Sequence, residues 1–541
     1  MAKNKGVRLN QQFLKTIEMK FSKYWILITL LCLGGFFVRI IWINHDLPLS
    51  LDSTGYFWYS IDTSISNHFP DQSCGWKCSF PNTGWPSFLT LFFKVLPSEN
   101  YLDFMNLQKY VGVIFSVLTV VPIFLISRFF LKKETAFLAS SLFLFNPRII
   151  ENSILGITEP IYIFTFSVTL LTLLKWPKFP VISFGFLALL VIIRYEAILL
   201  ILPIILIYFY KNRFNKKTII SCGISISIIF LILIPWGMMK NELTGQDGII
   251  SNVYAGPKYY SDVLEISNDK NEVIFDFIST GSIYTLRFLI TSTFPILIIT
   301  TPLGILFLLK KKELGILKIF FTIILFLLVP IFYGYSRAFL EVRYMLILFP
   351  IFSIISSFFF QEIFRDKQPK MYFTIIIVFV IFSTIIFLTW NNQEKNIEEY
   401  EFAKIVDSKM NVVNTYSGAM YLQEVRLEKL EKFPILRKDL PPGTNVLYLH
   451  MCNPNFIFDG CDQGYKNIEE FINKNKKNGL THIVIDNGFL HNPFFKDDFD
   501  NSEIYPYLVK IFDSKDEGFK YYYAKIYLID FKKIENIVNQ N

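Results

Sequence analysis

The stretch PLSLDSTGYFWYSIDTS occupies residues 48–64, directly after the first long apolar run of the chain. It places Asp52 a few residues beyond that run, followed by Tyr56, Trp58 and Tyr59. If the run spans a bilayer, Asp52 lies at the membrane–water boundary on the far side, among aromatic rings. A carboxylate in that position can act on a substrate whose own body stays in lipid.

The composition of the whole chain is that of a membrane protein. The 541 residues are 52% hydrophobic, include 58 Phe and are only 18% charged, whereas soluble proteins are about 45–50% apolar and about 25% charged. Apolar blocks of about 18–25 residues recur, each long enough to cross roughly 30 Å of hydrocarbon as a helix. The net charge is +8, but the basic residues lie beside apolar runs rather than in one patch, so no nucleic-acid partner is predicted.

We predict a mostly α fold with about eleven membrane-spanning helices. The predicted spans are residues 24–44, 107–131, 134–150, 158–175, 179–194, 196–210, 217–238, 286–309, 316–335, 342–362 and 371–390. The first run follows a basic segment, is too long for the core of a signal peptide and lacks a small-residue cleavage site. We therefore expect an uncleaved anchor with a cytoplasmic N-terminus.

The basic residues provide an independent test of this topology. With the N-terminus inside, every predicted inner connection should be rich in Lys and Arg. The residues at these connections are Arg128, Lys132 and Lys133; Lys175 and Lys178; Lys211, Arg213, Lys216 and Lys217; Lys310, Lys311, Lys312 and Lys318; and Arg365, Lys367 and Lys370. All five connections meet the rule, and an odd number of spans then places the C-terminal region outside, on the extracytoplasmic side of the plasma membrane.

The chain is expected to have two domains. Residues 1–390 form the transmembrane domain with long outer loops at 45–106 and 239–285, and residues 391–541 form an extracytoplasmic α/β domain. In the first loop, residues 84–96 predict an amphipathic helix at the membrane interface, with Trp85 at headgroup level. In the C-terminal domain we expect helices near 394–410 and 465–477, and strands at 411–415, 445–450, 482–487 and 521–531.

Four cysteines fall in predicted outer regions, as two pairs. Cys74 and Cys78 share the first outer loop, and Cys452 and Cys461 share the C-terminal domain. Paired cysteines in an oxidising compartment predict disulfides. A zinc site is the competing interpretation, and the five His of the chain give it little support.

Charged residues at the outer ends of the spans are the candidate functional residues, because charge near hydrocarbon is costly. They are Asp52, Asp62, Arg148, Glu151, Glu159, Arg194, Glu196, Arg337, Glu341 and Arg343. The chemistry that fits is transfer from a polyprenyl phosphate, whose chain stays in the bilayer while its phosphate and sugar reach the outer boundary. Such a transfer needs a base for the acceptor hydroxyl and cations for the phosphate left behind.

Asp52 is the candidate base, and Arg343 and Arg194 are candidates for binding the donor phosphate, because guanidinium donors match phosphate oxygens in pairs. The candidate substrate pocket contains Tyr56, Glu196, Arg337 and Tyr344.

Structural interpretations of these residues stay open. Asp52 can cap a helix that starts near Ser53, and Glu159 can simply favour the positive end of a helix dipole. Arg343 can pair with Glu341 or with Glu159.

The remaining candidates have structural interpretations too. Arg194 and Glu196 can mark a turn, and Asp62 is more readily explained as a solvated loop residue. The aromatic residues of the 48–64 stretch are typical of an interfacial belt.

Four short motifs resemble those of GT-C-type membrane glycosyltransferases, in particular protein O-mannosyltransferases and lipid A aminoarabinose transferases. They are Asp-Ser-x-Gly-Tyr from Asp52, Thr-Glu-Pro at 158–160, Arg-Tyr-Glu at 194–196, and Glu-Val-Arg-Tyr at 341–344 with a later Pro350. The similarity in layout extends over about residues 20–390, and an α/β domain at the C-terminus is also common on prokaryotic members.

This resemblance implies inverting transfer of a sugar from a polyprenyl- or dolichyl-phosphate to a protein, lipid or glycan acceptor at the extracytoplasmic face. It implies Asp52 as the base and Glu159 as a second acid in the same cavity, with a divalent metal such as Mg or Mn near the two. The chain departs from these relatives at Ser53, where they carry a second acid. It also lacks the Trp-Trp-Asp motif of the oligosaccharyltransferases that glycosylate Asn.

Two other functions compete with this prediction. One is transfer of a non-sugar group from a lipid carrier, and the other is a transporter or a non-catalytic membrane scaffold. Transporters usually show internal repeats and charges at the membrane midplane, whereas this sequence shows no repeat and has its charges at the outer ends of the spans.

Overall fold

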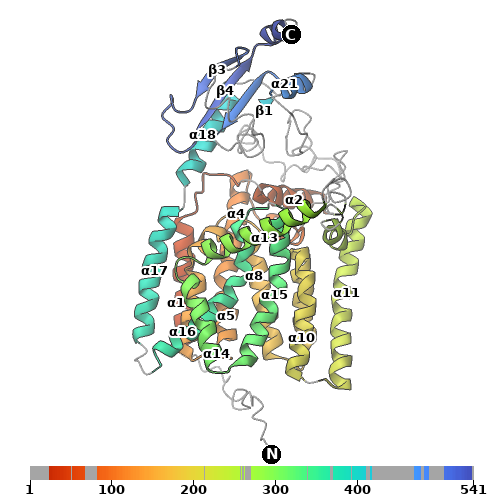
Figure 1. The fold of residues 1–541 in the computed structure, drawn as a ribbon, viewed down its shortest axis with the longest axis vertical. Coiled ribbons are helices and arrows are strands. Elements are labelled where there is room, and N and C mark those ends of the chain that lie inside the picture. Colours follow the sequence, from red (N-terminus) through yellow and green to blue (C-terminus); the bar gives the residue numbers. More distant parts are fainter. Residues whose placement is uncertain are drawn as a thin grey trace, which may run out of the picture.

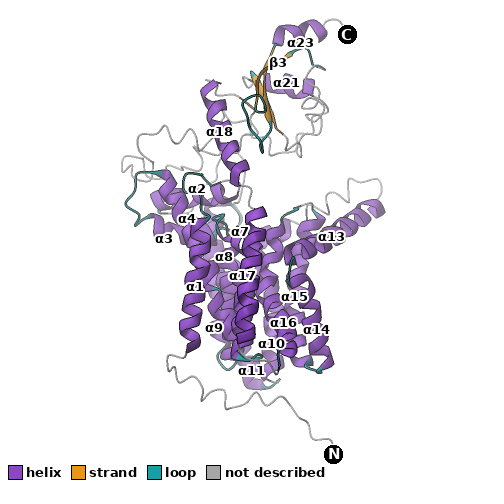
Figure 2. Cartoon of the chain, turned by 90° about the vertical axis from the view of Figure 1, so that its left-hand side faces the viewer, coloured by secondary structure: helices purple, strands orange, loops and turns teal. Residues whose placement is uncertain are grey.

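The structure of the protein is a computed structural model that describes residues 23–49, 52–67, 82–212, 214–255, 258, 261, 270–337, 339–365, 370–390, 393–409, 415–416, 468–476, 480–486 and 505–538. A bundle of helices forms most of the molecule, and a small sheet stands at one end of it (Figure 1). Figure 2 shows the same separation of helices and strands from a second direction.

The elements follow one another along the chain in three groups. The first half contains α1 (Lys23–Ile41), α2 (Asp52–Ser66), α3 (Gly84–Phe93), α4 (Tyr101–Leu118), α5 (Val120–Ser127), α6 (Lys133–Leu144), α7 (Pro147–Ser153), α8 (Glu159–Lys175), α9 (Pro180–Ile193), η2 (Tyr195–Leu200), α10 (Ile201–Asn212) and α11 (Lys216–Thr244). The rest of the bundle contains α13 (Lys270–Thr293), α14 (Leu297–Lys310), α15 (Leu314–Ser336), η3 (Val342–Leu348), α16 (Phe349–Ile363) and α17 (Lys370–Trp390). The C-terminal group contains α18 (Gln393–Lys409), β1 (Thr415–Tyr416), α21 (Ile468–Lys476), β2 (His482–Asp486), β3 (Leu508–Asp513), β4 (Ala524–Ile529) and α23 (Phe531–Val538).

Among the described residues, eight helical stretches are long and apolar enough to cross a membrane. Seven are Tyr24–Ile41, Tyr101–Ser127, Tyr195–Asn212, Lys216–Leu243, Lys270–Thr293, Leu314–Ser336 and Val342–Ile363, and the eighth includes most of α17. Large apolar side chains such as Phe37, Phe321 and Val378 are exposed on these helices, as expected of surfaces that face lipid rather than water. The chain is therefore a multi-pass membrane protein, and the arrangement of eleven spans remains a prediction.

Two of the predicted spans are wrong, and a proline explains each. Residues 134–150 form two helices, α6 and α7, because Pro147 begins α7 and Asn146 caps it by accepting from Arg148 N. Residues 286–309 are divided between α13 and α14 at Pro295, which has no backbone N–H and disfavours helix in the residue before it.

The two long outer loops contain helices. The first holds α2, α3 and the start of α4, and the second holds the end of α11 and much of α13. Trp85 of α3 is fully buried and donates from Nε1 to the carbonyl oxygen of Gly156 at 3.2 Å, so its ring packs inside the protein, and its position at headgroup level stays a prediction. Trp58 and Tyr59 are buried as well, because α2 packs against α3 inside the protein, and the interpretation as an interfacial belt is wrong for them.

The C-terminal sheet has the strand order β1-β2-β4-β3, with β1 and β2 parallel and the other pairs antiparallel. The helices predicted near 394–410 and 465–477, and the strands near 482–487 and 521–531, are present as α18, α21, β2 and β4. Of the strand predicted at 411–415, only Thr415 is among the described residues, and it begins β1. The strand predicted at 445–450 and the four paired cysteines lie outside the described residues.

Strand β3 was not predicted from the sequence. The register between β3 and β4 shifts between Lys510 and Phe512, and Val509 and Ile511 are both exposed. A bulge of this kind disturbs the alternation of buried and exposed residues by which a strand is recognised.

Helix α18 connects the sheet to the bundle. Glu398 accepts hydrogen bonds from the backbone N–H groups of Lys520, Tyr521 and Tyr522 at 2.9, 2.7 and 2.7 Å. On another side of α18, the hydroxyl of Tyr400 lies 3.5 Å from that of Tyr101 in α4. These contacts fix the sheet at the end of the bundle where α2 lies (Figure 1).

Candidate active site

Asp52 is the first residue of α2, and two structural features position it. Helix α2 packs on α3, where Ser60 Oγ donates to Pro86 O at 3.0 Å. The buried amide of Gln108 in α4 donates to Ser53 O at 2.9 Å and to Gly156 O at 2.7 Å. The start of α2 is thereby tied to the loop before α8, while the Asp52 side chain itself stays 54% exposed.

Glu159 is the first residue of α8 and only 3% of its side chain is exposed. The loop before it turns through Gly156, which has φ of +71°, a backbone conformation that glycine adopts without steric cost. A carboxylate at a helix N-terminus is favoured by the helix dipole. The helix dipole and the ionic contacts described below both stabilise the Glu159 carboxylate.

Arg194 lies between α9 and η2 and holds two carboxylates at once. Its Nη1 donates to Glu159 Oε1 at 2.7 Å and its Nη2 to Glu196 Oε1 at 3.1 Å. The residue therefore does more than mark a turn, because it joins the start of α8 to the start of η2. Within the described part of the chain, the second carboxylate oxygen of Glu196, Oε2, is buried and accepts no hydrogen bond.

Arg343 in η3 completes the cluster. Its Nη2 donates to Asp52 Oδ2 at 2.5 Å, and its Nε lies 3.9 Å from Glu159 Oε1 and 3.9 Å from Glu341 Oε2. Nε is buried and donates no hydrogen bond to any described residue. The guanidinium thus stands among three carboxylates and retains a donor for a further acceptor.

Aromatic rings enclose the two guanidinium groups. The ring of Tyr344 lies 5.5 Å from Cζ of Arg194 and 5.7 Å from Cζ of Arg343. The ring of Tyr162 lies 5.6 Å from Arg194 Cζ, and the ring of Tyr335 packs 6.1 Å from that of Tyr344. Such contacts attract a cation to the ring face and restrict the orientation of both arginines.

The pKa values of the groups outside the membrane spans follow from burial and neighbouring charge. Burial raises the pKa of the Tyr56 phenol well above its ordinary value, and Glu159 raises it further, so Tyr56 carries a neutral hydroxyl. Burial raises the pKa of Glu341, and Asp52 and Glu159 act in the same direction against the opposing charge of Arg343. Each added negative charge therefore disfavours ionisation of Glu341.

Four predicted residues lie apart from this cluster. Arg337 caps the C-terminus of α15, with its guanidinium against the rings of Tyr333 and Phe339. Arg148 pairs with Glu151 on α7 at 2.8 Å.

The fourth of these residues, Asp62, is buried in α2. The prediction that it is a solvated loop residue is therefore wrong, because α2 continues to Ser66 and packs against α3.

The predicted metal position between Asp52 and Glu159 does not fit a divalent ion. Arg343 already stands there as the cation, bonded to Asp52 and close to Glu159. Across the described ranges, no group of three His, Cys, Asp or Glu side chains has the arrangement of a metal-ligand set.

Three contributing residues were missed in the sequence. Tyr162 lies one helical turn after Glu159, and that spacing alone places both on one face of α8. Tyr335 and Gln108 gave no comparable signal, because an aromatic residue or a single amide within an apolar helix is ordinary in composition.

The chain is a polytopic membrane protein, and its fold is similar to that of a solved GT-C glycosyltransferase. The apo oligosaccharyltransferase of Archaeoglobus fulgidus is similar, with a TM-score of 0.51 and 13% identity over 87% of this chain and 70% of that one. At this level of identity the likeness concerns the fold alone.

Two further solved structures are similar at lower scores. The A. fulgidus oligosaccharyltransferase AglB with an inhibitory peptide and a dolichol-phosphate has a TM-score of 0.48 and 14% identity over 86% of this chain and 69% of that one. ArnT of Cupriavidus metallidurans in the apo state has a TM-score of 0.43 and 11% identity over 80% of this chain and 74% of that one. No protein-family model matches the chain, and no curated protein matches its sequence.

Proposed function

We propose that this chain is a glycosyltransferase that moves a sugar from a polyprenyl- or dolichyl-phosphate to an acceptor hydroxyl at the extracytoplasmic face of the plasma membrane. The observation that carries the proposal is the contact between Arg343 and Asp52, 2.5 Å apart, at the exposed edge of a buried cluster of charges. This contact pairs the two groups that the reaction requires, a carboxylate base and a cation for phosphate. The shared fold with an oligosaccharyltransferase supports the same class of reaction.

Asp52 acts as the general base. Its half-exposed carboxylate takes the proton of the acceptor hydroxyl while that oxygen attacks the anomeric carbon of the sugar. The bond between the anomeric carbon and the phosphate oxygen breaks, and the phosphate keeps the electron pair. Because attack and departure occur on opposite faces, the configuration at the anomeric carbon inverts. Proton transfer by a positioned carboxylate accelerates such a step by about 10²–10⁴-fold.

Arg343 binds the donor phosphate. Its Nε–H has no hydrogen-bond acceptor among the described residues, and its planar donors match two phosphate oxygens. When the phosphate takes over these donors, the Asp52 carboxylate is released from Arg343 and is available to the acceptor hydroxyl. Donor binding and activation of the base are in this way the same event.

Arg194 and Glu159, on the buried side of the cluster, assist this exchange of Asp52 for phosphate at Arg343. The guanidinium of Arg194 adds positive potential for the phosphate, and its bonds to Glu159 and Glu196 keep the cluster ordered. Glu159, the second acid, orients Arg343 from a distance of 3.9 Å.

The residues that surround this centre form the substrate pocket. Tyr56 offers a neutral hydroxyl, the ring of Tyr344 offers a face for the sugar, and Glu196 Oε2 is an acceptor for a sugar hydroxyl. Arg337 lies further out, at the end of α15, where it meets the acceptor. The acceptor is a protein, a lipid or a glycan.

The test is direct consumption of donor. The purified protein is incubated with a panel of radiolabelled polyprenyl-phosphate and dolichyl-phosphate sugars, with and without chelator, and loss of each donor is scored. We expect one donor to be consumed, and consumption to vanish in Asp52→Asn. Transport of a solute without consumption of any donor in the panel would instead establish a transporter, and transfer of a non-sugar group would establish the other alternative.

A further inference from the structure

Glu341 is a carboxylate beside Arg343 that has no part in the proposed reaction. Its main chain is anchored directly before η3, because its carbonyl oxygen accepts from the hydroxyl of Tyr335 at 2.9 Å and its N–H donates to Phe339 O at 3.0 Å. Its side chain is 52% exposed, and Oε2 lies 3.9 Å from Arg343 Nε. This Nε donates no hydrogen bond to any described residue. The carboxylate is therefore within ion-pair range of the arginine without being bonded to it.

The charges of the cluster do not balance. It contains more carboxylates than guanidinium groups among the described residues: Asp52, Glu159, Glu196 and Glu341 against Arg194 and Arg343. Arg194 bonds Glu159 and Glu196 at 2.7 and 3.1 Å. Arg343 is left with Asp52 and Glu341, both about half exposed. At its exposed edge, the cluster thus presents one cation and two carboxylates.

The two lipid phosphates of the proposed reaction differ in charge. In the donor, the phosphate is esterified to both the sugar and the polyprenol, and such a diester carries a single negative charge. The product left after transfer is a monoester, with a charge of about −1.5 to −2 at pH 7 because its second pKa is about 6. Product bound at Arg343 therefore brings more negative charge next to Glu341 than bound donor does.

This extra charge is unfavourable in either protonation state of Glu341. An ionised carboxylate repels the phosphate across a short distance, and a carboxylate that takes a proton instead must be protonated against the ambient pH. The charged groups that face it are Arg343 on η3, Asp52 on α2 and Glu159 on α8. The two acids already raise the pKa of Glu341, and a bound phosphate acts in the same direction. Arg343 attracts both lipid phosphates, whereas Glu341 opposes the more highly charged one.

We propose that Glu341 makes the phosphate site at Arg343 selective for the phosphodiester donor over the monoester product, and thereby favours release of polyprenyl phosphate after each transfer. The inference rests on the proposed function, because it takes a lipid phosphate at Arg343 as the ligand. Glu341 is in this role a specificity-determining residue that acts by repulsion. It takes no proton from the acceptor and forms no bond to the sugar.

The experiment compares two probes on the full-length protein in nanodiscs of neutral lipid. One is polyprenyl phosphate, a monoester, and the other is its methyl ester, a diester with a single charge. The two dissociation constants give one ratio for each variant, monoester over diester, and a substitution that merely loosens the site cancels in this ratio. We expect a ratio above one in the unmodified protein. In Glu341→Gln the ratio should fall about tenfold, the equivalent of one pKa unit of charge interaction, and Glu341→Asp should restore part of it.

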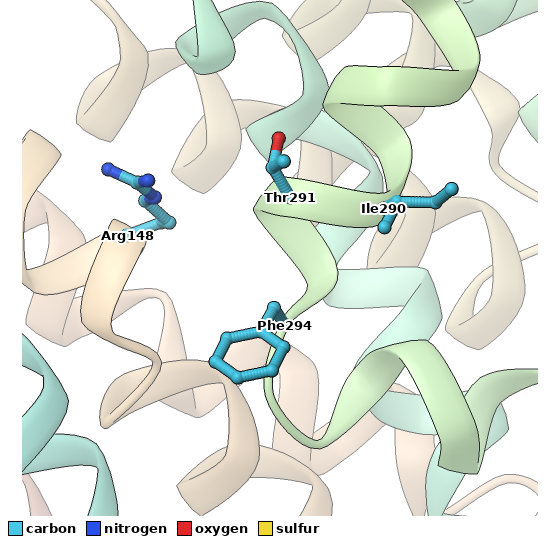
Figure 3. Close-up of a pocket in the computed structure, with 4 residues that line it drawn as sticks. All are labelled: Arg148, Ile290, Thr291 and Phe294. Carbon is cyan, nitrogen blue, oxygen red and sulfur yellow. The ribbon is translucent and has the colours of Figure 1, made fainter.

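A control variant removes a partly exposed carboxylate outside the cluster. Glu151 pairs with Arg148 at 2.8 Å, and Arg148 lines a different cavity with Thr291 and Phe294 across from it (Figure 3). Glu151→Gln should keep the ratio of the unmodified protein. The proposal is overturned by a ratio of one or less in the unmodified protein, by an equal ratio in Glu341→Gln, or by the same fall in Glu151→Gln.

The pH separates charge from the size of the methyl group. At about pH 5 the monoester carries mostly a single charge, because its second pKa is about 6. The ratio of the unmodified protein should therefore fall between about pH 7.5 and about pH 5. A ratio that does not change with pH would assign the preference to the methyl group and overturn the proposal.

Product inhibition distinguishes this proposal from the proposed function. The inhibition constant of added polyprenyl phosphate, divided by the KM for the donor, should be about tenfold lower in Glu341→Gln, by the same charge interaction. If the binding ratio changes as expected but no donor is ever consumed, the proposed function fails and the selectivity of the site stands. If donor is consumed and neither quantity differs between Glu341→Gln and the unmodified protein, the selectivity fails and the function stands.

Discussion

Arg343 Nη2 donates to Asp52 Oδ2 at 2.5 Å, across a separation of 291 residues in the chain. The Arg343 side chain comes from η3, and the Asp52 side chain comes from the first turn of α2. These two elements are far apart in the sequence. Asp52 is half exposed while Arg343 is largely enclosed, so a substrate reaches the carboxylate first. Under the proposed function, this ion pair is the contact that the donor phosphate exchanges.

Replacing Asp52 by Asn should abolish transfer. Asn keeps the size of the side chain and a hydrogen-bond acceptor for Arg343, but it cannot take a proton at neutral pH. We expect kcat to fall by about 10²–10⁴-fold, with expression and membrane insertion unchanged. Initial rates with the donor found in the panel measure this change.

The matched control for that variant is Asp46→Asn, which alters an exposed acid in the segment between α1 and α2. It should leave kcat and KM as they are. Full activity of Asp52→Asn would show that another group is the base.

Comparison of Arg343→Lys with Arg343→Ala should separate the contribution of positive charge to donor binding from that of the planar guanidinium. Lysine keeps the positive charge but lacks the planar pair of donors that matches phosphate. We expect the KM for the donor to rise about tenfold in Arg343→Lys and about 100-fold or more in Arg343→Ala, from the range of charge-assisted hydrogen bonds. Initial rates at varied donor concentration give the KM, and a KM that stays constant in both variants would remove Arg343 from the phosphate site.

The location of the site was predictable from sequence for a simple topological reason. Each pair of spans returns the chain to the same face, so Asp52, Glu159, Arg194 and Arg343 were expected together once the alternation of basic loops was known. The structure brings these four residues into one cluster. Their roles in the reaction remain proposals.

Other features depend on packing that no local pattern contains. The burial of Trp58 and Trp85 results from α2 and α3 packing inside the protein, whereas their sequences resemble interfacial segments. The contact of Gln108 with Ser53 and Gly156 joins three distant segments. Residue type alone gives no indication of such a contact.

Arg194→Ala should destabilise the protein strongly. The change leaves the buried carboxylate of Glu159 without its bond at 2.7 Å, and removing one partner of a buried ion pair costs about 3–5 kcal/mol of unfolding free energy. Unfolding in detergent with added denaturant measures the difference. The double variant Arg194→Met with Glu159→Gln should lose less, because the deeply buried Glu159 carboxylate is no longer left unpaired and only the 24% exposed Glu196 loses its partner.

A matched control for this pair lies at the other end of the bundle. Lys311 and Glu362 form an ion pair that is partly exposed, and Lys311→Ala should cost only about 0–1 kcal/mol. Equal losses in Arg194→Ala and Lys311→Ala would mean that the Arg194 pair is solvated.

Gly156→Ala should disturb the active site through the loop before α8. Gly156 has φ of +71°, and an added Cβ would lie 3.1 Å from Gln108 Cγ and 3.1 Å from Leu49 Cδ2. The side chain would therefore push against the amide that holds Ser53, next to Asp52.

Gly245→Ala is the control, because Gly245 has φ of +72° but no atom within 4 Å of the added Cβ. Both variants carry the left-handed backbone cost of about 1–2 kcal/mol, and only Gly156→Ala adds crowding. We expect similar small losses of unfolding free energy from the backbone term, a further loss in Gly156→Ala, and a fall in kcat in that variant alone. Equal kcat in the two variants would show that the Gly156–Gln108 contact does not position Asp52.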